Sequence, residues 1–146
     1  MSGTGRRGFS LVEVMVTVTI VGLAAGMVVL TSPQAGGVTH DAARFGAALT
    51  RARDEAILTS RTVEVRLTPT GYAFESLQGG VRKPLTGRSF QAGRWANGVH
   101  AASQSGERIV FDAIGLADPA SVVLTDGRRS AGVSVDPSGK VVVDGA

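Results

Sequence analysis

Near its start the chain reads Arg6-Arg7-Gly8-Phe9-Ser10-Leu11-Val12-Glu13, and it then carries no formal charge until Asp41. Residues 9–30 are therefore a run of 22 residues with Glu13 as the only charge. A helix of that length is roughly 33 Å long at about 1.5 Å per residue, and the apolar core of a bilayer is about 30 Å thick. The sequence predicts a transmembrane helix over residues 9–30.

Arg6 and Arg7 lie directly before the apolar run. Lysine and arginine concentrate on the cytoplasmic side of a membrane span. We therefore expect a single span with a cytoplasmic N-terminus and with the bulk of the chain on the outer side of the membrane.

Two other interpretations of the apolar run are open. Residues 12–21 alternate with period two and are rich in β-branched side chains, which is typical of a half-buried strand. The run is much longer than the average strand of about 5–6 residues, and a lone strand in lipid would leave its backbone unbonded. An ordinary signal peptide, which would release a soluble secreted protein, has a shorter apolar core and a small-residue cleavage site; Pro33 occupies the position where such a site would need a small residue.

The segment from Arg6 to Glu13 resembles the prepilin leader of type IV pilins and type II secretion pseudopilins. The resemblance implies that residues 1–8 are a leader peptide, which a membrane prepilin peptidase removes by cutting after Gly8 before it methylates Phe9. A carboxylate inside an apolar span is costly, so Glu13 is expected to have a function. The resemblance implies that this carboxylate pairs with the new ammonium of a neighbouring subunit, which would make Glu13 an assembly residue. In the alternative interpretation, the side chain of Glu13 only extends to the lipid headgroups.

The rest of the chain predicts a helix followed by strands. Pro33 and the pair Gly36-Gly37 weaken the helix within residues 31–60, and Thr39 is a suitable cap for an amphipathic stem helix that extends to about Ser60. Its apolar face consists of Phe45, Leu49, Ala52 and Ala56. Residues 61–146 are expected to form a β domain that begins with a hairpin of residues 63–67 and 72–77, followed by strands near 108–111, 121–125, 132–135 and 140–143.

Three downstream motifs resemble the minor pseudopilin H family, which is also called GspH or FimT. They are the end of the stem helix at residues 51–57, Val-Phe-Asp-x-x-Gly at residues 110–115, and Val-Asp-Pro-Ser-Gly-Lys-Val at residues 135–141. The resemblance implies an α+β, pilin-like fold in which a long N-terminal transmembrane and stem helix packs on an antiparallel β-sandwich.

The same resemblance implies a structural role at the tip of the periplasmic pseudopilus of a type II protein secretion system. The protein would be anchored in the bacterial inner membrane with its C-terminal domain in the periplasm. The implied partners are the prepilin peptidase, the major and other minor pseudopilins, the inner-membrane assembly platform and secreted cargo. The leader motif is shared with type IV pili, so the sequence leaves the choice of machine open.

A basic region offers an alternative function, that of a type IV pilus minor pilin which binds DNA for uptake. Cations in this region could pair with phosphates while Phe90 and Trp95 stack on bases. The sequence favours the simpler interpretation, a solvated loop whose aromatic rings cover the edge of the sheet. The candidate contacts are Arg82, Lys83, Arg88 and Arg94, together with Arg128 and Arg129 in a later turn.

No pattern in the sequence indicates an enzyme, a cofactor or a metal site. The chain has no cysteine, and its two histidines, His40 and His100, lie in different segments without nearby ligand spacing. The net charge of +3 falls by two, to +1, once Arg6 and Arg7 are removed with the leader. The basic character of the full chain is therefore weak evidence for a nucleic-acid partner.

Overall fold

The computed structural model describes residues 10–31 and 37–145, which form two compact units. The first unit contains helix α1 (Leu11–Thr31). The threonine hydroxyls of this helix bond internally, since Thr17 donates to the carbonyl oxygen of Glu13 at 2.7 Å and Thr19 to that of Met15 at 2.8 Å. The expected helix is confirmed over the described part of the apolar run, despite its β-branched composition; Phe9 lies outside the described residues.

In the described ranges, 10–31 and 37–145, no helix combines the length and hydropathy that a membrane span requires.

The second unit begins with helix α2 (Val38–Thr59). Gly37, in an extended conformation, is its N-cap, so the predicted cap at Thr39 is wrong by two residues. At the other end Ser60 adopts a left-handed conformation, and its N–H points to the carbonyl oxygens of Ala56 and Ile57, which is a common way to satisfy the last carbonyls of a helix. The predicted apolar face is confirmed, because Phe45, Leu49, Ala52 and Ala56 are all buried.

The first antiparallel sheet, sheet A, has the strand order β3-β2-β1-β6, with the short strand β4 paired to β2. Thr68 pairs with Gly71, so the predicted hairpin is confirmed and has a two-residue turn. A 3-10 turn, η1 (Arg88–Phe90), connects β3 to β4. The strands are β1 (Val63–Thr68), β2 (Gly71–Gln78), β3 (Val81–Pro84), β4 (Gly93–Arg94) and β6 (Arg108–Phe111).

The second antiparallel sheet, sheet B, has the strand order β5-β7-β8-β9. Three of its strands match the predicted runs to within two residues. The fourth, β5, was not predicted from the sequence. The strands are β5 (His100–Ser103), β7 (Ala120–Thr125), β8 (Ser130–Val135) and β9 (Val141–Gly145).

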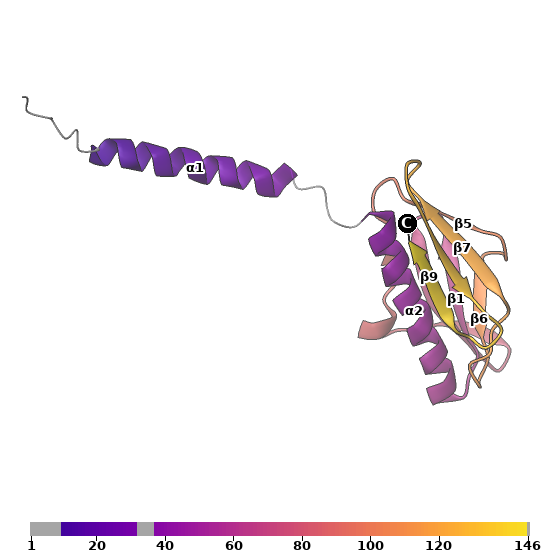
Figure 1. The fold of residues 1–146 in the computed structure, drawn as a ribbon. Helices are drawn as coiled ribbons and strands as arrows, with labels where there is room; N and C mark the ends of the chain where they lie inside the picture. The colour runs from indigo at the N-terminus through magenta and orange to yellow at the C-terminus, as the bar shows by residue number, and fades with distance from the viewer. Residues whose placement is uncertain (1–9, 32–36, 146) are drawn as a thin grey trace, which may run out of the picture. The chain divides into compact units, whose positions relative to one another are not determined.

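Helix α2 lies along the two sheets and shares one hydrophobic core with them (Figure 1). Alternate residues of the strands face this core, for example Val122 and Leu124 of β7. The aromatic rings meet beside the helix, where Phe45 lies 5.1 Å from Tyr72 and 5.4 Å from Trp95, measured between ring centroids. The expected α+β, pilin-like fold is confirmed for this unit, which has a complete core of its own.

Candidate functional site

The predicted assembly residue Glu13 lies in the first turn of α1. The carbonyl oxygen of Ser10 accepts hydrogen bonds from the amides of Glu13 and Val14, at 2.9 and 3.1 Å. A carboxylate in the first turn interacts favourably with the positive end of the helix dipole. Among the described residues, no cation lies within ion-pair distance of Glu13. The predicted leader residues Arg6, Arg7 and Gly8, and the predicted methylation site Phe9, lie outside the described residues.

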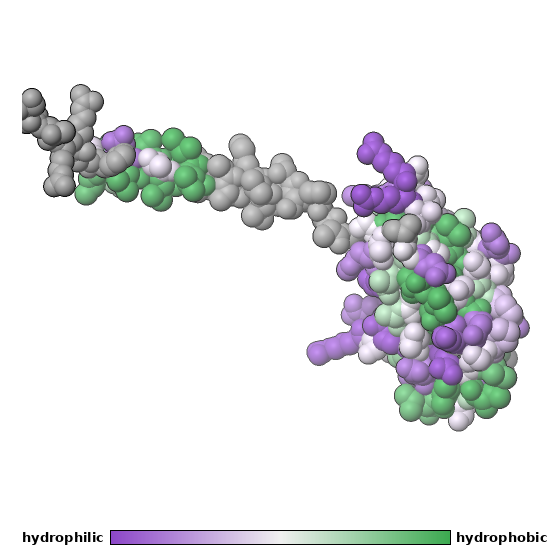
Figure 2. Space-filling view, in the orientation of Figure 1, coloured by the Kyte–Doolittle hydropathy of each residue, from purple (hydrophilic) through white to green (hydrophobic). Residues whose placement is uncertain are grey.

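Large apolar side chains surround Glu13 on α1 and are exposed in this unit. Leu11 is 76% exposed and Val18 is 65% exposed, and Met15, Ile20 and Val21 are similar. Figure 2 shows this segment of α1 as mainly hydrophobic, with a few polar residues among the apolar ones. A helix that is apolar on every side needs lipid or other helices around it.

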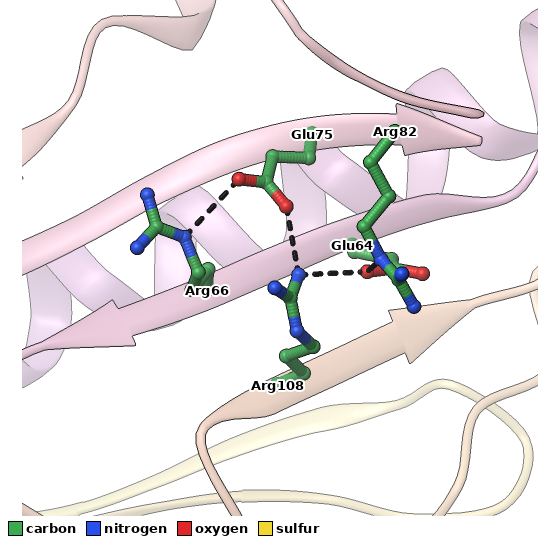
Figure 3. A network of polar contacts seen from close by, with 5 residues as sticks. All are labelled: Glu64, Arg66, Glu75, Arg82 and Arg108. Atoms are coloured by element: carbon green, nitrogen blue, oxygen red, sulfur yellow. Dashed lines mark hydrogen bonds and ion pairs between the residues drawn. The ribbon is translucent and has the colours of Figure 1, made fainter. Parts of the chain in front are cut away.

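The outer face of sheet A carries a network of five charged residues, which we call the sheet A network (Figure 3). Arg108 lies at its centre, where one guanidinium nitrogen, Nη1, is 3.0 Å from Glu64 and 2.7 Å from Glu75. A second arginine contacts each carboxylate: Arg82 lies 2.8 Å from Glu64, and Arg66 lies 3.1 Å from Glu75. Each carboxylate is therefore held by two arginines.

The strand register explains why the network needs both signs of charge. Glu64 lies directly opposite Glu75 on β1 and β2, and Arg66 lies directly opposite Arg108 on β1 and β6. Like charges in opposed positions destabilise a sheet, but here each such pair is bridged by a residue of the other sign. The hydrogen bond from Arg108 is the main cause of a lowered pKa at Glu75, and the same contact raises the pKa of Arg108. The side chain of Glu64 is only 5% exposed, so its two arginines offset its desolvation.

A second polar cluster joins the start of α2 to the loop after β4. Asp41 is 2% exposed and accepts a hydrogen bond of 2.7 Å from the amide of Ala96. Arg44 lies 3.1 Å from the Asp41 carboxylate, and its guanidinium also donates to the carbonyl oxygen of Arg94. These contacts hold Trp95 against the core. Burial raises the pKa of the neighbouring Tyr72 phenol.

The three downstream motifs meet at the end of α2. Arg53 donates from Nε to the carbonyl oxygen of Gly115 at 3.2 Å. A Cβ atom at Gly139 would lie 2.0 Å from that same oxygen, so the two loops are in close contact. Each loop is held by an aspartate: Asp112 accepts from the amides of Ile114 and Leu116, and Asp136 from the amide and hydroxyl of Ser138. The motifs therefore build a structural junction.

The basic residues that were candidates for DNA contact are divided between the two sheets of the described domain. Arg82 is held by Glu64, and the others lie on β3, η1, β4 and, for Arg128 and Arg129, on the β7–β8 turn of the other sheet. The aromatic rings that would stack on bases pack against other aromatic side chains of the domain. Trp95 is buried against Phe45, and Phe90 packs on Phe74 with ring centroids 5.4 Å apart.

In the described ranges, no group of three or more acidic, histidine or cysteine side chains could hold a metal ion. The polar residues that matter most to the domain, Asp41, Glu64 and Arg108, were not identified from the sequence. The position of Asp41 in the first turn of a helix was an available signal. For Glu64 the sequence contains no comparable signal, because the burial of its side chain depends on the register of three strands.

Two family sequence models match the chain. The model described as type II transport protein GspH matches residues 41–139, and the prokaryotic N-terminal methylation motif matches residues 4–29. A type II secretion system protein H from Klebsiella michiganensis is 32% identical over 75 residues, which are 50% of this chain and 41% of that protein. The chain thus aligns with less than half the length of this relative.

Solved structures with the same fold come from both secretion and pilus systems. The minor pseudopilin EpsH of Vibrio cholerae has a TM-score of 0.66 at 15% identity, covering 74% of this chain and 96% of EpsH. The type IV minor pilin FimU of Pseudomonas aeruginosa has a TM-score of 0.61 at 20% identity, covering 73% and 87%. E. coli GspH has a TM-score of 0.61 at 18% identity, covering 80% and 96%. Structural likeness alone does not separate the two systems, but the family model spans most of the chain, which belongs to the GspH family of type II transport proteins.

Proposed function

We propose that this chain is a minor pseudopilin, a structural subunit of the periplasmic pseudopilus tip of a type II protein secretion system. The observation that supports the proposal best is the presence of two matches in one chain, the methylation motif over residues 4–29 and the GspH family over residues 41–139. The role is structural: the protein is built into a filament and catalyses no reaction.

In this proposal the prepilin peptidase cuts after Gly8 and methylates Phe9. The cut exposes an ammonium at the start of the helical segment. The carboxylate of Glu13, which lies in the first turn of α1, then pairs with the ammonium of a neighbouring subunit. Each of the two charges would be costly in an apolar environment without the other.

The proposed location is the bacterial inner membrane, with residues 9–30 as a single span, Arg6 and Arg7 on the cytoplasmic side, and the domain from α2 onward in the periplasm. The exposed apolar surface of α1 and its internally bonded threonines support this arrangement, because lipid offers no partner for a free hydroxyl. The proposed partners are the prepilin peptidase, the major and other minor pseudopilins, the inner-membrane assembly platform and secreted cargo.

The alternative role of a DNA-binding minor pilin is not favoured. It would need Phe90 and Trp95 at the surface, whereas both pack on other aromatic rings. Among its candidate cations, Arg82 is held by Glu64, and Arg128 and Arg129 lie on the turn between β7 and β8 in the other sheet.

Two measurements on the full chain in its own host test the proposal. Mass spectrometry of the mature protein should find an N-terminus at methylated Phe9; an N-terminus beyond Leu30 would instead support an ordinary signal peptide and refute the proposal. The variant Glu13→Ala should still insert in the membrane but should be lost from the filament, whereas Glu13→Asp keeps the charge and should retain part of the incorporation. Normal incorporation of Glu13→Ala would refute the pairing role.

A further inference from the structure

Strand β5 differs from the other strands at the sheet edges in the described domain. Besides the two-residue strand β4, which pairs only with β2 and carries Arg94, the two sheets end at β3, β6, β5 and β9. Three of these strands carry a formal charge, namely Arg82 on β3, Arg108 on β6 and Asp144 on β9. Charges and short lengths protect edge strands from pairing with another chain. The sequence of β5, His100-Ala101-Ala102-Ser103, is as short as β3 and β6, but it has only small side chains after its histidine and no formal charge.

The register of β5 shows which of its backbone groups are free. The amide of Gln104 donates to the carbonyl oxygen of Ser121 at 3.1 Å, one step beyond the pairing of Ser103 with Val122. Hydrogen-bonded residues alternate in an antiparallel pair, so Ala102 also bonds to β7 while Ala101 and Ser103 direct their N–H and C=O groups away from it. Outside the β5–β7 ladder, neither Ala101 nor Ser103 makes a backbone hydrogen bond within the described domain.

A groove lies beside the residues that carry these free groups. It consists of two adjoining hollows that share Pro69 and His100, with volumes of about 390 and 420 Å³. The first is lined by Ala101 and Ser103, with Leu67, Thr68 and Glu107. The second continues past Thr70 to Asn97. We call the two hollows together the β5 groove.

Trp95 adds a second observation at the far end of the groove. It lines the second hollow and is only 7% exposed. Its indole Nε1 is buried and has no hydrogen-bond partner among the described residues. A buried donor without an acceptor costs about 1–3 kcal/mol. The same region thus contains unpaired backbone groups on β5 and an unpaired side-chain donor.

We propose that the β5 groove binds an extended segment of a neighbouring pilin-type subunit, which adds a strand to β5. Only an extended backbone presents donors and acceptors at the spacing of Ala101 and Ser103. Glu107 lines the groove and belongs to no ion pair among the described residues, which favours a lysine or arginine on the incoming segment. A second copy pairing through its own β5 would need a two-fold axis, whereas subunits that follow one another in a filament make head-to-tail contacts. The inference rests on the proposed role as a filament subunit.

Proline substitution separates strand addition from folding. The N–H of Ala101 faces away from β7, so Ala101→Pro removes a donor needed by an added strand while it leaves the β5–β7 ladder intact, and edge strands tolerate proline at such positions. The matched control Ala101→Val adds bulk but keeps the N–H. Ser103→Pro is a second variant of the same kind. Fluorescence of Trp95, the only tryptophan in the chain, reports whether each variant is folded.

The experiment measures how much full-length protein is recovered in sheared filaments from the native host. Loss of one hydrogen bond corresponds to about a fivefold to tenfold loss of incorporation for Ala101→Pro and Ser103→Pro, while Ala101→Val should incorporate like the wild type. Folded proline variants that incorporate normally would overturn the strand addition and leave the proposed function standing. A wild-type protein that is absent from filaments would overturn both. If both proline variants unfold, hydrogen exchange decides, since filament formation should protect the amides of Ala101 and Ser103 in the wild type; unchanged exchange would refute the proposal.

A photo-reactive residue at Thr68, on the wall of the groove opposite β5, identifies the occupant. The expected crosslink joins Thr68 to an extended segment of a different pilin-type subunit. A crosslink only to a second copy of this chain, only to secreted cargo, or to no protein would overturn the choice of partner.

Discussion

The buried carboxylate of Asp41 should account for a large share of the stability of the domain. Replacing it by alanine removes a charge-assisted hydrogen bond to the amide of Ala96, worth about 1.5–3 kcal/mol. It also removes the ion pair with Arg44 and a favourable interaction with the start of α2, worth about 0.3–1 kcal/mol. We expect Asp41→Ala to lower the free energy of unfolding by about 3 kcal/mol, which corresponds to a fall in Tm of about 12 °C for a domain of this size.

The assay is urea and thermal unfolding of residues 37–146, which have a complete core, followed through the fluorescence of Trp95. The clamp at Ala96 is adjacent to Trp95, so the variant should also shift the emission of the folded state to longer wavelength. Asp41→Asn keeps an acceptor for the amide and should cost about 1 kcal/mol. Asp54→Ala, on the exposed face of the same helix, is the matched control and should cost less than about 0.5 kcal/mol. An Asp41→Ala domain as stable as the control, with unchanged emission, would refute the reasoning.

Three further substitutions test other contacts by the same unfolding assay. Gly139→Ala should lower the free energy of unfolding by about 3 kcal/mol or more, because the new Cβ would collide with the carbonyl oxygen of Gly115. Gly80 has a similar positive φ but open space around it, so Gly80→Ala should lower the free energy of unfolding by only about 1–2 kcal/mol. Equal losses for the two variants would contradict the collision. Gly46→Ala places a Cβ 2.4 Å from a side-chain carbon of Val143, so it should lower the free energy of unfolding by about 1–3 kcal/mol. Adding Val143→Ala should restore part of this loss. A double variant whose loss of stability equals the sum of the two single losses would argue against that contact. The pKa of Glu75 is lowered in the folded state, so its ion pair stabilises the fold above the ordinary pKa of 4.5, and this stabilisation is lost as the pH falls through the folded pKa. The difference in unfolding free energy between the wild type and Arg108→Gln should therefore shrink on acidification. A difference that stays constant with pH would contradict the role of this pair.

The helices and the central strands could be predicted from the sequence because burial gives them a period. Leu49 and Ala52 follow the helical period on the buried face of α2, and Val63 and Val65 follow the strand pattern on β1. Strands β3 and β5 were missed for the opposite reason, and strand β4 was missed because its two residues are too few to show a period. Every residue of β3 is exposed, and β5 at the edge of sheet B is half covered at most, so neither shows an alternation between apolar and polar residues.

The polar sites were harder to predict because they depend on register. Arg82 looked like a free cation in the sequence, and its partner Glu64 is 18 residues away on a strand that is not adjacent to β3. Arg108 is 44 residues from the same carboxylate. Only the order of four strands brings these side chains together, and no local pattern records that order. The leader motif, by contrast, can be recognised from the sequence alone, because all of its elements are contiguous in the chain.

The two units differ in what completes them. The domain from α2 onward buries its apolar residues in one core and pairs its buried carboxylates within itself. In α1, by contrast, the described apolar side chains are exposed and the charge of Glu13 is unmatched among the described residues. A segment of this kind is stable only when lipid or other helices cover it and an ammonium reaches its carboxylate. In the proposed role, residence in the membrane and incorporation into a filament would both cover the apolar surface, but only the filament would offer the ammonium of another subunit to Glu13. The same carboxylate that makes insertion in lipid costly would then favour transfer into the filament.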